Sequence, residues 1–72
     1  MLAIVLKHST FRRVSTRLRY EGSFVYFSSL LSRVFNDEGF TYLYFNSLSD
    51  MCSATDYLSA HNGVYRVVDL SL

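Results

Sequence analysis

The sequence has 72 residues, of which half are hydrophobic and 17% are aromatic, and its formal net charge is +1. This apolar content excludes a disordered chain, and the small net charge excludes a polybasic tail or an acidic mimic of nucleic acid. A chain of this length forms one domain at most, so residues 1–72 are expected to fold as a single unit.

The single cysteine, Cys52, excludes an internal disulfide, and a reducing cytoplasmic compartment is the default expectation. The first six residues are apolar, but Lys7 interrupts them too early for a signal peptide or a membrane span. We therefore interpret residues 2–6 as a short buried strand, and we expect no contact with a membrane.

A first helix is predicted to begin at Ser9 or Thr10, which can cap it, and to end at Gly22, which favours a left-handed stop. Its apolar stripe consists of Phe11, Val14 and Leu18. Outside this stripe lie four arginines: Arg12, Arg13, Arg17 and Arg19. They are either the solvated face of the helix or a basic patch that binds nucleic acid. Residues 14–20 also alternate at period two, so a strand, with Arg17 and Arg19 on one face, is the alternative.

Residues 24–35 fit both a helix and a strand. Helical spacing relates four of their side chains: Phe24, Phe27, Leu31 and Val34. In contrast, residues 24–27 have the composition of a strand, and residues 36–39 (Asn-Asp-Glu-Gly) predict a type I turn that closes a hairpin. If Phe35 pairs with Phe40 across this four-residue loop, Ser32 and Val34 point inward, whereas Arg33 and Phe35 lie on the opposite face.

Residues 40–45 form the clearest strand, because their side chains alternate between two faces. The inward set is Thr41, Leu43 and Phe45, and the outward set is Phe40, Tyr42 and Tyr44. Residues 47–50 match a capping box, which predicts a helix that ends at residues 61–63, and residues 64–70 form the last strand. The order β-α-β-β-α-β predicts a ferredoxin-like sandwich of the α+β class, in which two helices cover one face of a four-stranded antiparallel sheet.

The stretch from Glu38 to Phe45 (Glu-Gly-Phe-Thr-Tyr-Leu-Tyr-Phe) resembles the second ribonucleoprotein motif of the RNA recognition motif family, and the resemblance extends over residues 38–63. In that family the aromatic residues that match Phe40 and Tyr42 stack on bases at the open face of the sheet. The resemblance implies this role for these two residues. The sequence departs from the family at Glu38, where a Lys or Arg is usual, and in the first strand, which has no aromatic residue.

An exposed aromatic face suits a protein partner as well as single-stranded RNA. The predicted binding face consists of Phe40, Tyr42, Tyr44, Arg33, Phe35 and Arg66. We rank a protein-interaction module first, for example a small viral or mobile-element protein that inhibits a host protein complex, or a self-associating subunit such as a homodimer. An RNA-binding module that stacks bases on Phe40 and Tyr42 is the alternative.

No set of residues predicts catalysis. His8 and His61 are far apart in the sequence and belong to no known metal or nucleophile motif, so we expect no enzyme activity, no metal site and no cofactor. Cys52 is expected to be a small packed hydrophobic residue.

Overall fold

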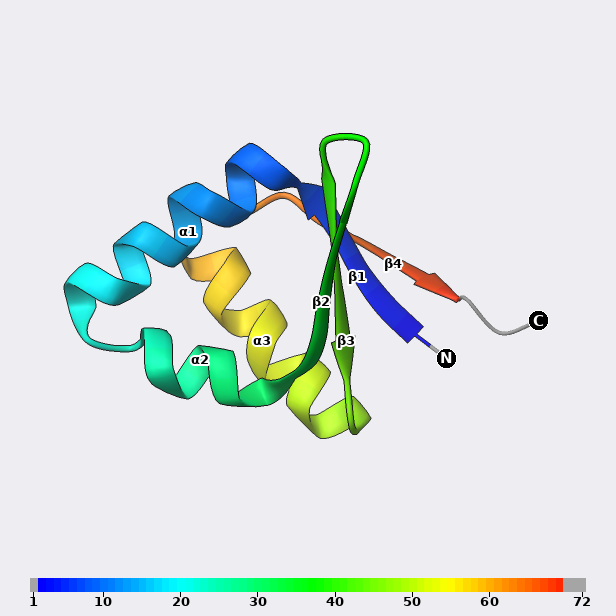
Figure 1. Ribbon diagram of the computed structural model, residues 1–72. Coiled ribbons are helices and arrows are strands. Elements are labelled where there is room, and N and C mark those ends of the chain that lie inside the picture. The colour runs from blue at the N-terminus through cyan, green and yellow to red at the C-terminus, as the bar shows by residue number, and fades with distance from the viewer. Residues whose placement is uncertain (1, 70–72) are drawn as a thin grey trace.

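The computed structural model describes residues 2–69, which form an α+β domain with a four-stranded antiparallel sheet and three helices (Figure 1). In chain order the elements are β1 (Leu2–Lys7), α1 (His8–Glu21), α2 (Phe24–Leu30), β2 (Leu31–Asp37), β3 (Phe40–Phe45), α3 (Leu48–Ala60) and β4 (Arg66–Asp69). The strand order is β2-β3-β1-β4, and each neighbouring pair is antiparallel. The predicted class and the antiparallel sheet are therefore confirmed.

The helices form one layer beside the sheet, to its left in Figure 1, and the core lies between the two layers. Alternate residues of the central strands supply the sheet side of this core, and the apolar stripes of the helices supply the other. Its fully buried large side chains are Phe27, Ile4, Leu18, Leu43, Leu58 and Val14. Within residues 2–69, none of the helices has the length and hydropathy needed to cross a lipid bilayer.

The first helix is confirmed, and the strand alternative for residues 14–20 is wrong. The helix begins at His8, directly after β1, with Lys7 as an N-cap that makes no side-chain hydrogen bond, so neither Ser9 nor Thr10 caps it. Gly22 ends it in the left-handed conformation (φ 81°), as predicted. The Gly22 N–H donates to the carbonyl of Arg19, and the Ser23 N–H donates to that of Leu18 (2.8 Å), which is a Schellman motif.

Residues 24–35 contain a helix, residues 24–30, followed by a strand that begins at residue 31, so the predicted strand is right only for the second part and the strand composition of residues 24–27 is misleading. In α2, helical spacing buries Phe27 and Leu30 against the other helices. The chain becomes extended at Leu31, which pairs with Phe45, and the register then shifts at a bulge around Ser32. Ser32 is exposed rather than inward, because the bulge gives the position facing the helices to Leu31.

The hairpin closes through a two-residue loop instead of the predicted four-residue loop. Asp37 pairs with Phe40, and both Glu38 (φ 51°) and Gly39 (φ 83°) are left-handed, as in a type I′ turn. This turn matches the right-handed twist of the two strands, which a type I turn would splay apart. The pairing of Phe35 with Phe40 is therefore wrong: Phe35 pairs with Tyr42.

The last helix and strand follow the sequence closely. The hydroxyl of Ser47 accepts a hydrogen bond from the Asp50 N–H (3.1 Å), which confirms the cap of α3. Beyond α3 the chain turns back at Gly63, whose N–H donates to the Leu58 carbonyl (2.7 Å). Strand β4 begins at Arg66 instead of residue 64, and residue 70, its predicted end, lies outside the described residues.

The prediction of two helices is wrong, because α2 adds a third between α1 and the hairpin. The order of elements is accordingly β-α-α-β-β-α-β, and the ferredoxin-like β-α-β-β-α-β sandwich is not confirmed. In Figure 1, α2 connects the far end of α1 to the start of β2. This additional helix brings Phe27 into the core, where the sequence analysis had expected a strand.

Candidate binding face of the sheet

The face of the sheet that points away from the helices, called the outer face below, contains all six residues of the predicted binding face. The strand register arranges its residues in three rows. The first row is Arg33, Tyr44, Ala3 and Val68; the second is Phe35, Tyr42, Val5 and Arg66; the third is Asp37, Phe40 and Lys7. Directly opposite residues of neighbouring strands project to the same side, so each row forms a line of adjacent side chains.

Aromatic rings cover the β2–β3 half of the outer face. The rings of Phe35 and Tyr42 lie 6.2 Å apart with an interplanar angle of 56°, and the guanidinium of Arg33 lies 5.9 Å from the centre of the Phe35 ring. Phe35 (44%) and Phe40 (42%) are substantially exposed. When a partner covers these exposed rings, their apolar surface is removed from water, and this burial favours binding.

The β1 part of the outer face carries two small apolar side chains, those of Ala3 and Val5. Ala3 is fully buried although no helix covers this side of the sheet, so the side chains around it cover it. Its row neighbours Tyr44 and Val68 are only partly buried, as is Val5 in the next row. These small residues on the central strand, with larger ones on either side, form the apolar centre of the outer face.

Three cations and one carboxylate surround this apolar centre. Lys7, Arg33 and Arg66 are exposed, and the only acidic residue in the three rows is Asp37. None of these four side chains forms an ion pair with another residue of the described chain. The outer face is thus locally positive, although the whole chain has a net charge of only +1.

A polar network beneath the hairpin fixes the outer face relative to the helices. The buried hydroxyl of Thr41 donates to Oδ1 of Asn36 (2.8 Å), so Nδ1 of His8 is the donor in its contact with Oγ1 of Thr41 (3.1 Å). The His8 N–H also donates to the carbonyl of Gly39 (2.8 Å). The start of α1 therefore holds both strands of the hairpin in place.

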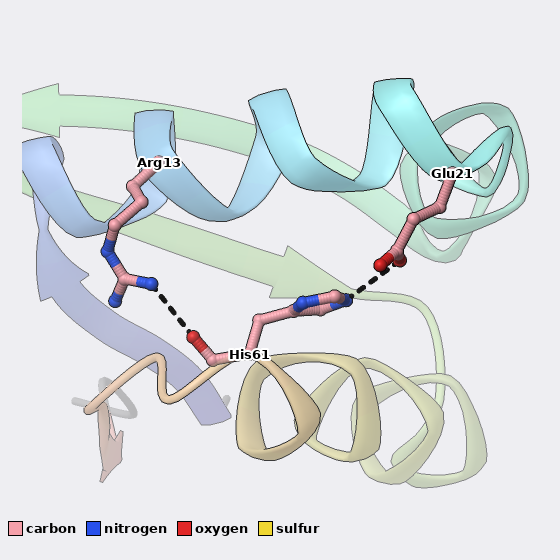
Figure 2. Close-up of polar contacts among 3 residues, drawn as sticks. All are labelled: Arg13, Glu21 and His61. Atoms are coloured by element: carbon pink, nitrogen blue, oxygen red, sulfur yellow. Dashed lines mark hydrogen bonds and ion pairs between the residues drawn. The ribbon is translucent and has the colours of Figure 1, made fainter.

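The four arginines of α1 are not brought together into one patch. Arg13 points toward α3, where its guanidinium donates to the carbonyls of His61 (2.9 Å) and Asn62 (3.0 Å). Figure 2 shows the bond from Arg13 to the His61 carbonyl beside a second contact, in which Nε2 of His61 lies 3.1 Å from a carboxylate oxygen of Glu21. Arg13 therefore ties the end of α3 to α1.

The other three arginines differ in their surroundings. The guanidinium of Arg19 lies over the ring of Phe24, 4.1 Å from its centre. Arg12 and Arg17 are exposed and have no hydrogen-bond or ion-pair partner among residues 2–69. In a helix, Arg12 and Arg19 share one flank, and Arg13 and Arg17 share another.

Lys7 and Asp37 also lie on the outer face, although neither was predicted to belong to the binding face. The alternation of the first strand is the signal that could have found Lys7, since Ala3, Val5 and Lys7 fall on one side of a strand.

Cys52 is exposed, so the expectation that it is packed is wrong. Within residues 2–69, no group of three or more His, Cys, Asp or Glu side chains could hold a metal ion.

Comparisons with family models, curated proteins and solved structures find no match to this chain.

Proposed function

We propose that this chain is a non-enzymatic interaction module that binds a partner protein through the outer face. The observation that carries the proposal is the combination of exposed rings with uncompensated cations. Phe35 and Phe40 supply apolar area, and Lys7, Arg33 and Arg66 surround it with only Asp37 to balance them. A complementary partner has an apolar centre and an acidic rim.

The charge of the outer face favours a different protein over a second copy. In a symmetric dimer built through this face, the same patch meets itself. Six cations would then share one interface with two carboxylates, and like charges across an interface oppose association. An acidic partner satisfies the cations instead.

We also infer a ferredoxin-like relationship for the fold. Strands β1 and β2 are both antiparallel to β3 and therefore parallel to each other, with β3 between them. This split arrangement is typical of a ferredoxin-like sandwich, in which the outer face stays free of helices. In this interpretation α2 is an insertion between the first helix and the second strand.

Single-stranded RNA is the second candidate partner. The observation that favours it is the position of Phe40 and Tyr42 in adjacent rows of the outer face, as expected from the resemblance to the RNA recognition motif. Each base stacked on an aromatic ring contributes about 1–3 kcal/mol, and the nearby cations can bind phosphates.

The test compares two tyrosine variants. Tyr42→Asp places a charge in the middle of the outer face, whereas Tyr20→Asp places the same charge on α1, where the side chain is 88% exposed. Immobilised wild-type protein and both variants are used to capture partners from an extract of the native organism. We expect one protein that binds wild type and Tyr20→Asp, and whose affinity for Tyr42→Asp, measured with the purified partner, is at least a hundredfold lower.

Circular dichroism checks that both variants stay folded. Equal binding to the two variants would refute docking through the outer face. Loss of oligonucleotide binding in Tyr42→Asp alone, with a steep dependence on salt, would assign the face to RNA instead. A light-scattering mass of two chains that falls to one chain in Tyr42→Asp would assign it to self-association.

A further inference from the structure

A depression on the flank of α1, called the α1 depression below, lies in the helical layer and contains no residue of the outer face. Its volume is about 300 Å³. It is lined by His8, Phe11, Arg12, Ser15, Thr16 and Arg19. The lining includes two arginines and two hydroxyl groups but no carboxylate, so the charge of the depression is positive.

Ser15 is the unusual residue of the α1 depression. It is only 4% exposed, and its hydroxyl oxygen is buried without a hydrogen-bond partner in the described structure. A hydroxyl that leaves water without gaining a partner destabilises the fold, and nearly all buried polar groups in proteins avoid this state. A ligand that accepts a hydrogen bond from Ser15 would remove the penalty.

The two arginines of the α1 depression flank Ser15 along the helix. Arg12 precedes it by three residues and Arg19 follows it by four, so both start on the same side of α1, one turn away in each direction. The guanidinium of Arg19 lies over the ring of Phe24, 4.1 Å from its centre. Within residues 2–69 the guanidinium of Arg19 donates no hydrogen bond, so its N–H groups are available as donors.

No other group in the described structure uses these donors. Arg12 and Thr16 have no hydrogen bond or ion pair within residues 2–69, in contrast to Arg13, which donates to two carbonyls of the turn after α3. His8 uses Nδ1 toward Thr41. The α1 depression therefore combines two unpaired guanidinium groups with an unsatisfied buried hydroxyl.

We propose that the α1 depression binds a phosphate group. Arg12 and Arg19 supply the opposite charge and planar pairs of donors, and the Ser15 hydroxyl, once it rotates about the Cα–Cβ bond out of its buried position, supplies a donor between them. A tetrahedral phosphate offers several acceptor oxygens in different directions, which suits two guanidinium groups and one hydroxyl better than a flat carboxylate does. This site is additional to the outer face and does not depend on the function proposed for it.

The test is a titration with inorganic phosphate at constant ionic strength, followed by amide chemical shifts and by the melting temperature. The wild type is compared with Ser15→Ala and Arg12→Gln, and Arg17→Gln is the matched control on the other flank of α1. We expect saturable shifts at residues 8–19 in the wild type. Affinity should fall about tenfold or more in Ser15→Ala and Arg12→Gln, and less than about twofold in Arg17→Gln.

The melting temperature separates the proposed role from a purely structural one. Without phosphate, Ser15→Ala should melt at a higher temperature than the wild type, because alanine removes the unsatisfied hydroxyl and favours the helix. With phosphate, the wild type should gain stability, while Ser15→Ala should not. Equal phosphate effects in the wild type and Ser15→Ala, or equal losses in Arg12→Gln and Arg17→Gln, would overturn the proposal, as would the absence of saturable shifts.

A second titration with glycerol 3-phosphate distinguishes a phosphate ester from the free ion. Both ligands present the same charged group, so both should require Ser15. Tighter binding of glycerol 3-phosphate identifies an ester as the ligand class, and tighter binding of inorganic phosphate identifies the free ion. Binding of either ligand that does not require Ser15 contradicts the proposal.

Discussion

Truncating Phe27 tests the helix that the sequence analysis did not resolve. Phe27 is fully buried, and its ring packs edge-on against Tyr57, with 5.7 Å between ring centres and an interplanar angle of 77°. Replacing a buried Phe with Ala costs about 3–5 kcal/mol, because apolar contacts are lost and a cavity remains. The lost edge-to-face pair places Phe27→Ala toward the upper end of this range.

This loss is large in comparison with the stability of the whole domain. At about 0.05–0.15 kcal/mol per residue, a chain of 72 residues has a free energy of unfolding of about 4–11 kcal/mol. Phe27→Ala should therefore lose about half of this free energy or more, and it is unfolded in buffer if the wild-type value lies at the low end of the range. Phe27→Leu keeps most of the apolar volume, and we expect it to stay folded with a loss of about 1–2 kcal/mol.

Val25→Ala is the matched control, because Val25 belongs to the same helix but is 80% exposed. In a helix, this change should alter the free energy of unfolding by less than about 0.5 kcal/mol. In a strand, Val25 and Phe27 would share a face and both changes would be costly. Urea unfolding followed by circular dichroism at 222 nm measures all three variants. Losses of similar size in Val25→Ala and Phe27→Leu would refute the helix.

Two further predictions concern the hairpin and the end of α3. Glu38 holds a left-handed conformation next to Gly39, so Glu38→Asn should raise the free energy of unfolding by about 0.5–1 kcal/mol, as thermal melts can show; a decrease would contradict the type I′ turn. Arg13→Gln should lower it by about 0.5–1.5 kcal/mol, because the carbonyls of the turn after α3 lose a charged donor. In the same urea titration Arg17→Gln should be nearly neutral, and equal effects of the two changes would contradict the clamp between α1 and α3.

Local signals predicted the parts of the fold that local geometry controls. Gly22 ends α1 because a residue without a β-carbon adopts the left-handed conformation at little cost. The presence of glycine at this position is therefore enough to predict the end of the helix. The cap of α3 at Ser47 depends on a hydroxyl and an amide three residues apart. Neither feature needs knowledge of the rest of the chain.

The boundary inside residues 24–35 depends on distant contacts instead. Residues 24–35 contain no glycine and no proline, so no local signal marks the change from helix to strand after Leu30. The burial of Phe27 and Leu30 against the other helices favours the coiled form for one half. Pairing of β2 with β3 favours the extended form for the other. Both preferences exist only once the chain has folded.

The α1 depression could not be predicted for a similar reason. The sequence shows Ser15 among four arginines, but it does not show which hydroxyl is left without a partner. That outcome depends on how α1 packs beside its neighbours. The role of Arg13 likewise requires the end of α3 to lie beside α1. The two elements approach so closely there that a β-carbon added at Gly63 would lie 3.2 Å from Cγ2 of Val14, which is tighter than most such contacts.

The outer face was nevertheless placed correctly although the hairpin register was wrong, and the reason is the parity of a strand. Moving from the predicted pair, Phe35 with Phe40, to the observed pair, Phe35 with Tyr42, shifts the register by two residues. A shift by an even number keeps every side chain on its own face, whereas a shift by one exchanges the faces. A shift by one residue would bury the charge of Arg33, which is costly. The sequence therefore constrains the side of the sheet on which the rings lie more strongly than it constrains which residues they pair with on the neighbouring strand. The binding proposal depends on the side alone, because a partner meets the same rings and cations in either even register.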